Sequence, residues 1–360
     1  MWSPIFSVHA SISTDGNTCA GVALYLTWPE SKTALPGQGR IGVAVLVTGG
    51  AGFVGSHLVN RLLESGRRVV VLDNFNDYYD PALKRRNVDE IRSAYLQSDL
   101  EVVEGDLRDA EMLKELFRAH GFELVHHLAA MAGVRASIQN PVLYFDVNVQ
   151  GTMNLLEAAV EAGRPPVVFA SSSSVYGGSP HIPFSEDDPV NQPISPYAAS
   201  KKAAELVCHT YHHLYGLDIT CLRFFTVYGP RQRPEMAIHR FTRRMTEGRP
   251  VPMFGDGGTS RDYTYIDDVI DGVMAAADNC SGYRIYNLGN SHPIALRDLI
   301  ERLASILGIE PEIDQQPQPP GDVECTWADI SQAEKNLGYA PEIALDEGLR
   351  RFVEWFKARQ

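Results

Sequence analysis

Tyr197 and Lys201 stand four residues apart in the segment Ser-Pro-Tyr-Ala-Ala-Ser-Lys. This spacing places both side chains on one face of a helix. A lysine ammonium beside a tyrosine phenol favours the phenolate, and a phenol that ionises near neutral pH can remove the proton from an alcohol. By itself the pair is more typical of an ordinary amphipathic helix, so its interpretation depends on the rest of the chain.

A glycine-rich turn that could hold a dinucleotide lies far upstream of this pair. Gly49, Gly52 and Gly55 come after the apolar run 43–47 and open a segment with helical spacing at 53–64. In such a turn the first glycine permits the tight bend, the second lets the backbone approach a pyrophosphate, and the third lets the helix pack on the strand. The sequence therefore predicts a nicotinamide dinucleotide here.

Two acidic residues are placed to meet the adenosine half of that dinucleotide. Asp73 closes the second expected strand, where a carboxylate accepts hydrogen bonds from the ribose hydroxyls and repels a 2′-phosphate. We therefore expect NAD rather than NADP. Asp106 follows the third expected strand and could meet the adenine; alternatively it caps a helix that begins at Leu107.

A run of serines closes the expected strand at 167–170, in the segment Ser171-Ser172-Ser173-Ser174. A serine at the carboxyl end of a strand can hydrogen-bond a reacting oxygen beside a phenolate. Runs of serine are also common in loops, so the interpretation depends on the glycine turn and the Tyr197–Lys201 pair occurring in the same chain.

Strand and helix patterns alternate over the first two thirds of the chain. Strands are expected at 43–47, 69–72, 100–103, 124–128, 167–170 and 219–225. This alternation predicts an α/β fold, a Rossmann-type doubly wound parallel sheet covered by helices on both faces. After residue 228 prolines and glycines become frequent and the strands shorten, which predicts a smaller, interleaved C-terminal substrate-binding lobe.

The same patterns suggest where the domains begin and end. We expect an NAD-binding domain over 41–227, to which 264–289 returns, and a substrate-binding lobe over 228–263 and 290–360. Residues 1–40 are rich in Ser, Thr, Gly and Pro. We expect them to form an extension outside the fold; the alternative is an added edge strand.

The composition excludes several classes of protein. The net charge of −13, from 32 basic and 45 acidic residues, argues against general nucleic-acid binding. Five cysteines without a Cys-x-x-Cys pattern fit reduced thiols in the cytoplasm rather than a disulfide framework or a metal site. No apolar run reaches transmembrane length, and the first basic residue is Lys32, so the expected protein is cytoplasmic, without a membrane partner.

With these residues in place, the chain resembles the extended short-chain dehydrogenase/reductases. The segments 223–230 and 255–263 are similar to those of the nucleotide-sugar 4-epimerases in that family, and the resemblance runs from about residue 43 to the C-terminus. It implies NAD as cofactor, a UDP-sugar as substrate and a homodimer. It also implies that Tyr197 is the base, that Lys201 lowers the pKa of Tyr197 and holds the nicotinamide ribose, and that Ser172 and Ser174 lie at the substrate O4.

The resemblance assigns further residues to the two ligands. The expected cofactor contacts, besides the three glycines, Asp73, Asp106, Tyr197 and Lys201, are Phe53, Val54, Asn74, Leu107, Leu128, Ala129, Ala130, Asn148 and Phe224. The expected substrate contacts, besides Ser172, are Arg135, Thr226, Arg233, Met236, Pro252, Phe254, Arg261 and Asp322.

Two features indicate which reaction of the family to expect. Dehydratases carry an Asp-Glu pair directly after the strand-end hydroxyl, where this chain has Ser173 and Ser174, so epimerisation is favoured. The loop 74–80, Thr226 and Arg233 resemble the UDP-glucuronate 4-epimerases more than the UDP-glucose enzymes. Arg233 would hold the C6 carboxylate; the alternative is a surface arginine in a proline-rich loop.

The chemistry of a uronic acid agrees with this assignment. Oxidation at C4 gives a β-keto acid, which loses CO₂ when its carboxylate turns perpendicular to the ketone, and a planar guanidinium could hold the carboxylate through two hydrogen bonds. We therefore expect conversion of UDP-glucuronate to UDP-galacturonate through a transient 4-keto intermediate. The alternatives are a UDP-glucose or UDP-N-acetylglucosamine 4-epimerase, and an NAD-binding sensor without catalytic activity.

Overall fold

The computed structural model describes residues 43–95, 99–318 and 323–359. The expected extension at 1–40 and the expected ligand contact Asp322 lie outside the described residues.

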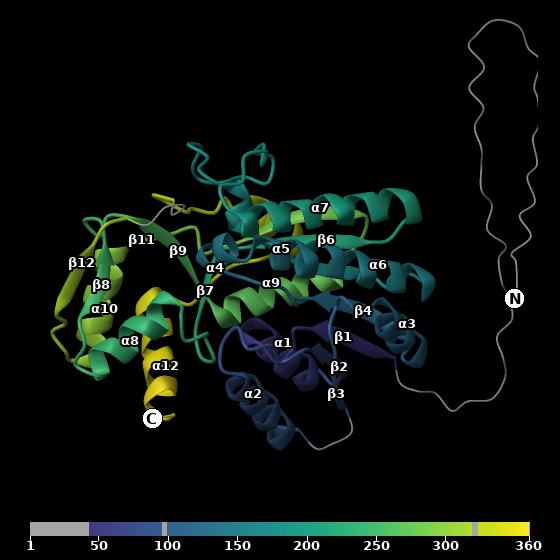
Figure 1. Ribbon diagram of the computed structural model, residues 1–360, viewed down its shortest axis with the longest axis horizontal. Helices are drawn as coiled ribbons and strands as arrows, with labels where there is room; N and C mark the ends of the chain where they lie inside the picture. Colours follow the sequence, from purple (N-terminus) through teal and green to yellow (C-terminus); the bar gives the residue numbers. More distant parts are fainter. Residues whose placement is uncertain (1–42, 96–98, 319–322, 360) are drawn as a thin grey trace, which may run out of the picture. The chain divides into compact units, whose positions relative to one another are not determined.

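A seven-stranded sheet forms the centre of the fold (Figure 1). Its strands, in spatial order, are β10 (Tyr283–Leu288), β6 (Ile219–Phe224), β5 (Val167–Ser172), β4 (Phe122–His127), β1 (Ala44–Thr48), β2 (Arg68–Asp73) and β3 (Leu100–Glu104). All neighbouring strands pair in parallel. The prediction of a doubly wound parallel sheet is thus confirmed.

The side chains of β1 show why this sheet needs a helical layer on each face. Val45 and Val47 belong to one hydrophobic cluster, whereas Ala44 and Leu46 belong to another, because successive residues of a strand point to opposite faces. All five residues of β1 are buried, as expected of an apolar strand covered on both sides.

The helices divide between the two faces (Figure 1). On one side lie α3 (Ala110–Ala119), α4 (Val134–Gln139), α5 (Pro141–Phe145), the π-helix η1 (Asp146–Gln150), α6 (Gly151–Glu161) and α7 (Pro196–Tyr215), preceded by the 3₁₀ turn η2 (Ser173–Tyr176). On the other side lie α1 (Phe53–Glu64), α2 (Pro81–Ala94) and α9 (Ile266–Asp278). Leu58 and Leu62 of α1 and Val269 of α9 share one hydrophobic cluster.

The remaining elements form a smaller lobe. A three-stranded sheet has the order β11 (Pro293–Ala295), β9 (Ser260–Tyr265) and β7 (Thr226–Tyr228), and β8 (Val251–Phe254) pairs with β12 (Ile313–Gln316). Its helices are α8 (Ala237–Thr246), α10 (Leu296–Leu307), α11 (Ser331–Leu337) and α12 (Leu345–Lys357). The chain leaves this lobe at α9 and β10 to complete the large sheet and then returns, so the two parts interleave.

The order of strands also determines where a ligand can bind. The chain builds β1, β2 and β3 in one direction and then places β4 on the opposite side of β1. In such a sheet the crevice lies outside the carboxyl ends of the strands at this switch point. Among the described residues, no helix combines the length and hydrophobicity needed to span a bilayer.

Candidate active site

A cavity of about 400 Å³ opens at the carboxyl ends of the central strands. Its walls come from the turns and helices that follow β1, β2, β3, β4, β5, β6 and β7. The expected site residues that line it are Gly49, Gly52, Phe53, Val54, Gly55, Asp73, Asn74, Asp106, Leu107, Leu128, Ala129, Ala130, Ser172, Ser174, Tyr197, Lys201, Phe224, Thr226, Arg233 and Met236.

The glycine turn between β1 and α1 has no room for side chains at two of its positions. Gly49 has a φ of +70°, and a Cβ there would lie 2.8 Å from the backbone of Ala129. A Cβ on Gly55 would lie 2.2 Å from the carbonyl oxygen of Gly49. Gly52 precedes α1, which no described side chain caps, so the first backbone N–H groups of the helix are available to an anion. The turn therefore fits the pyrophosphate of a dinucleotide.

Asp73 is buried at the end of β2 and is held by the backbone around it. One carboxylate oxygen accepts a hydrogen bond from the backbone N–H of Ala51 (3.2 Å), and the other accepts one from that of Phe75 (2.9 Å). The Nζ of Lys84 lies 3.9 Å away. Burial raises the pKa of Asp73, and the nearby Lys84 opposes the rise.

Asp106 does not cap the helix that follows it, so this alternative is wrong. Helix α3 begins later and is capped by Asp109, which accepts a hydrogen bond from the backbone N–H of Met112. The Asp106 carboxylate instead accepts hydrogen bonds from Asn74 and Arg108, both at 2.9 Å. The hydrogen bonds from Arg108 hold the pKa of Asp106 well below its ordinary value, so the carboxylate is charged at the cavity wall.

Tyr197 and Lys201 both line the cavity from the first turns of α7. Ser195 caps this helix, because its Oγ accepts a hydrogen bond from the backbone N–H of Ala198 (3.1 Å). The Nζ of Lys201 donates to the carbonyl oxygen of Ala170 at 2.7 Å. Burial lowers the pKa of Lys201 to about 8.

The groups that act on Tyr197 differ from those we expected. Burial raises the pKa of the phenol; a hydrogen bond with Ser172 and the positive charge of Arg233 oppose this rise. We expected Lys201 to be the group that lowers this pKa. In the structure its ammonium is held by the carbonyl of Ala170 at the end of β5, and the opposing influences come from Ser172 and Arg233 instead.

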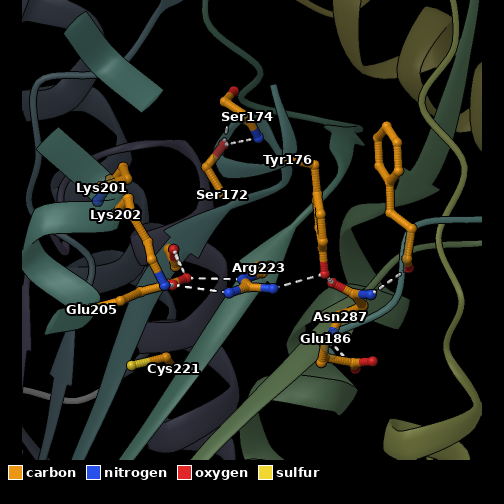
Figure 2. A network of polar contacts seen from close by, with 12 residues as sticks. Ser172, Ser174, Tyr176, Glu186, Lys201, Lys202, Glu205, Cys221, Arg223 and Asn287 are labelled. Carbon is orange, nitrogen blue, oxygen red and sulfur yellow. Dashed lines mark hydrogen bonds and ion pairs between the residues drawn. The ribbon is translucent and has the colours of Figure 1, made fainter. Parts of the chain in front are cut away.

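The serine run forms a small hydroxyl cluster beside the phenol. Ser172 ends β5, and its Oγ accepts a hydrogen bond from the backbone N–H of Ser174 (3.2 Å) and donates one to the Oγ of that residue (3.1 Å). Figure 2 shows the two hydroxyls facing each other near the end of the strand. Together with Tyr197 they form a group that can hydrogen-bond and deprotonate an alcohol.

Arg233 reaches the same cavity from the loop between β7 and α8. Its side chain is 24% exposed, and its Nε lies 2.7 Å from a carboxylate oxygen of Glu235. The guanidinium also lies 5.7 Å from the ring centre of Tyr78. A largely buried guanidinium in the cavity wall is not the surface arginine considered as the alternative.

Several expected site residues do not line the cavity. Asn148 is buried, and its side-chain amide accepts a hydrogen bond from the backbone N–H of Met131 (2.8 Å) and donates one to the Oγ of Ser200 (2.9 Å). The others are Arg135, Pro252, Phe254 and Arg261.

Two cationic side chains approach the ring of Phe254. The guanidinium of Arg135 lies 4.7 Å from the ring centre, and that of Arg240 lies 5.9 Å from it. Arg240 was not among the expected residues. Burial and the neighbouring positive charge of Arg135 lower its pKa, which marks a place where cations gather and an anion would be attracted.

Tyr78, Tyr79, Lys84 and Met131 also line the main cavity, although they were not among the expected ligand contacts. The two tyrosines belong to the loop 74–80, which the resemblance had already singled out. Lys84 carried no signal, because its approach to Asp73 joins a helix to the end of a strand through tertiary packing alone.

No group of three or more His, Cys, Asp or Glu side chains in the described part of the chain is arranged to hold a metal ion.

The amino-acid sequence is similar to those of known proteins of one family. A model of the NAD dependent epimerase/dehydratase family matches residues 45–289. UDP-glucuronate 4-epimerase 3 of Arabidopsis thaliana is 46% identical over 336 residues, which cover 88% of this chain and 77% of the plant protein. UDP-glucuronate 4-epimerase of Thermodesulfobacterium geofontis is 46% identical over 314 residues, 87% of this chain and 95% of the bacterial one.

A solved structure is similar over the same part of the chain. The crystal structure of UDP-glucuronic acid 4-epimerase from Bacillus cereus, in complex with UDP-glucuronic acid and NAD, superposes with a TM-score of 0.83 and 37% sequence identity. The match covers 88% of this chain and 100% of that one.

Proposed function

The chain belongs to the NAD dependent epimerase/dehydratase family, and from this membership we propose that it interconverts UDP-glucuronate and UDP-galacturonate, with NAD as its cofactor. The observation that carries the proposal is the position of Arg233, a largely buried guanidinium in the same cavity as Tyr197 and Ser172. A uronic acid has a carboxylate at C6, and a guanidinium suits it because its planar fork donates two parallel hydrogen bonds.

The contacts of the catalytic residues support a role for each of them. The Tyr197 phenolate takes the proton from the C4 hydroxyl and later returns it, while Ser172, which already bonds the phenol, orients the reacting oxygen. When bound, NAD would supply a reversible hydride acceptor for C4, so that return of the hydride to the opposite face of the 4-keto sugar inverts the configuration. Lys201, whose Nζ donates to the Ala170 carbonyl, would hold the ribose of the nicotinamide with its remaining N–H donors.

Arg233 has a second role during the reaction. The 4-keto intermediate is a β-keto acid, and decarboxylation requires its carboxylate to turn perpendicular to the ketone. Two hydrogen bonds from a guanidinium that is itself held by Glu235 restrain this rotation. Thr226 and Met236 complete the wall around the sugar.

The residues that would hold the cofactor lie along the carboxyl edge of the sheet. The Gly49–Gly55 turn would hold the pyrophosphate, Asp73 would accept hydrogen bonds from the adenosine ribose, and Asp106 would meet the adenine. The carboxylate of Asp73 would repel a 2′-phosphate, which supports NAD over NADP.

In this proposal the two ligands are bound by different parts of the chain. Residues 41–227 with 264–289 hold NAD, and 228–263 with 290–360 hold the UDP moiety. Phe254 and Pro252 of β8 support the base, whereas Arg135 and Arg261 meet the diphosphate. The pairing of Phe254 with two guanidinium groups supports this placement, because an aromatic ring and cations suit a nucleotide diphosphate.

The protein acts as a cytoplasmic homodimer in this proposal. Apolar side chains on α4, α5 and α7 are exposed on the described chain, namely Ile138 (52%), Val142 (80%), Leu206 (57%) and Leu214 (62%). A surface of this kind supports pairing with a second copy. The four described cysteines are free thiols, which supports a reducing compartment.

Nuclear magnetic resonance of UDP-glucuronate incubated with the NAD-loaded protein and no added reductant tests the proposal. We expect UDP-galacturonate to accumulate to equilibrium, and the Tyr197→Phe protein to lose at least about a hundredfold in rate. Arg233→Ala should weaken UDP-glucuronate binding and release CO₂, with UDP binding unchanged. UDP-glucose and UDP-N-acetylglucosamine are assayed in parallel; faster turnover of either sugar would refute the uronate assignment.

A further inference from the structure

A second cavity of about 360 Å³ lies on the far side of Arg233 and Tyr79, the two residues that line both cavities. Its other walls come from α2, from the loop between β7 and α8, from α8, and from α12 with the residues that follow it. The reaction proposed above uses none of these other residues. The volume is sufficient for a small organic molecule.

The lining of this second cavity is strongly cationic. Its five guanidinium groups belong to Arg86, Arg231, Arg233, Arg243 and Arg359. Two carboxylates pair with three of them: Glu90 contacts both Arg231 and Arg359, and Glu235 contacts Arg233. The cavity thus keeps an excess of positive charge in a chain whose net charge is −13.

Two of the five guanidinium groups are available to a ligand. Arg86 and Arg243 form neither an ion pair nor a side-chain hydrogen bond with any residue that the structure describes. The carboxylate of Glu247 also lines the cavity, but it lies 3.0 Å from Arg249, which is not part of the lining. Arginines gathered in a concave, partly buried site focus their field on an anion.

Another part of the wall is aromatic. Trp355 and Phe356 of α12 and His239 of α8 line this part. The ring centre of His239 lies 6.1 Å from that of Trp355 and 5.3 Å from that of Phe356. Burial lowers the pKa of His239 to about 4, so this ring is neutral under ordinary conditions. The site combines several fixed positive charges with an apolar floor.

We propose that this cavity is a second anion-binding site, which takes a small molecule with several negative charges borne by carboxylate or phosphate groups. Arg233 couples it to the active site, and this coupling rests on the function proposed above. An anion in the second cavity attracts the Arg233 guanidinium and reduces its hold on the C6 carboxylate. The affinity for UDP-glucuronate therefore falls, whereas the affinity for UDP, which has no such carboxylate, does not.

Calorimetric titration tests for the site itself. The Tyr197→Phe protein, loaded with NAD and saturated with UDP, is titrated with citrate as a carboxylate probe and with pyrophosphate as a phosphate probe. We expect at least one probe to bind, and to bind at least tenfold more weakly when either Arg243→Gln or Arg86→Gln is added. Arg92→Gln, an exposed position on the same helix as Arg86, is the matched control and should leave binding unchanged.

The outcomes distinguish the site from the function. The site is refuted if neither probe binds, or if both lining variants bind as tightly as the control. With the better probe present, the dissociation constant of UDP-glucuronate should rise at least threefold while that of UDP stays constant; equal changes, or none, refute the coupling. Binding of the probe requires no turnover, so failure of the epimerase assay alone would leave the site standing.

Discussion

Replacement of Glu205 by glutamine should destabilise the fold strongly, although the residue lies outside the cavity. Glu205, on α7 one turn beyond Lys201, and Arg223, on β6, form a buried ion pair with side chains that are each 1% exposed. The carboxylate accepts hydrogen bonds from Arg223 Nε (2.9 Å) and Nη2 (3.0 Å) and from Ser171 Oγ (2.7 Å). Figure 2 shows the Glu205 carboxylate facing the Arg223 guanidinium.

The expected magnitude follows from the charge that the substitution leaves behind. Glu205→Gln keeps the shape and the acceptor for Ser171, but it leaves the Arg223 guanidinium buried without its counter-ion. Removing one partner of such a pair costs about 3–5 kcal/mol. In a thermal unfolding scan this corresponds to a drop of roughly 5–10 °C. The exposed pair between Arg85 and Glu104 supplies the control, since Glu104→Gln should cost less than about 1 kcal/mol.

The double variant Glu205→Gln with Arg223→Met isolates the reason. It removes the uncompensated charge and should therefore be more stable than the single variant by at least about 2 kcal/mol. Tyr176 loses a donor to its hydroxyl but keeps its own bond to Asn287 (2.7 Å). If the double variant were no more stable than the single one, the argument from the buried charge would be refuted.

The pH dependence of stability provides an independent check on the same pair. The hydrogen bonds and charge of Arg223 hold the pKa of Glu205 below its ordinary value of 4.5. An acid whose pKa is lower in the folded than in the unfolded state stabilises the fold above its unfolded pKa. This contribution is lost as the pH falls through the folded pKa. Wild-type stability should therefore fall more steeply in acid than that of Glu205→Gln.

Two further predictions concern the cofactor turn and the lysine. Gly55→Ala should weaken NAD binding at least tenfold in a fluorescence titration, because the new Cβ would lie 2.2 Å from the Gly49 carbonyl oxygen. Gly121→Ala is the control, because a Cβ there meets nothing within 4 Å, and it should leave NAD binding unchanged. Equal effects of the two substitutions would contradict the steric argument. Burial lowers the pKa of Lys201 to about 8, so its ammonium loses a proton above that pH and kcat/KM should fall there. The Lys201→Arg protein should not show this decrease, because an arginine stays charged. Because the unfolded lysine titrates near 10.5, this group makes the protein more stable, by up to about 3 kcal/mol, as the pH rises from 8 to 10.5.

The parts of the fold and site that sequence could predict are those fixed over short distances along the chain. The buried strand β1, the glycine turn and the start of α1 form one continuous segment, and each residue type there has a local reason. Tyr197 and Lys201 share a helix, so their common face follows from the helical period alone. The arrival of both groups in one cavity follows from the rule that ligands bind at the carboxyl ends of parallel strands.

The features that sequence could not predict depend on contacts between distant segments, or on where a helix begins to within a few residues. Asp106 and Asp109 are equally suited to cap a helix. The chain first forms a turn in which the Asp109 N–H donates to the Asp106 carbonyl, and the helix therefore begins after Asp109, which caps it. The spacing of Tyr197 and Lys201 does not reveal that the Ala170 carbonyl holds the ammonium. The approach of Arg240 to Phe254 likewise joins a helix and a strand that have no shared local pattern.

The distribution of arginine explains how such an acidic chain can attract an anionic substrate. With a net charge of −13, the distant field of the protein repels a nucleotide sugar acid, so attraction must come from cations placed within a few ångströms. Arg233 supplies such a charge in the main cavity, and Arg135 and Arg240 supply two more beside Phe254. Because Arg233 also lines the second cavity, the residue proposed to recognise the C6 carboxylate is the one through which a second anion would be sensed.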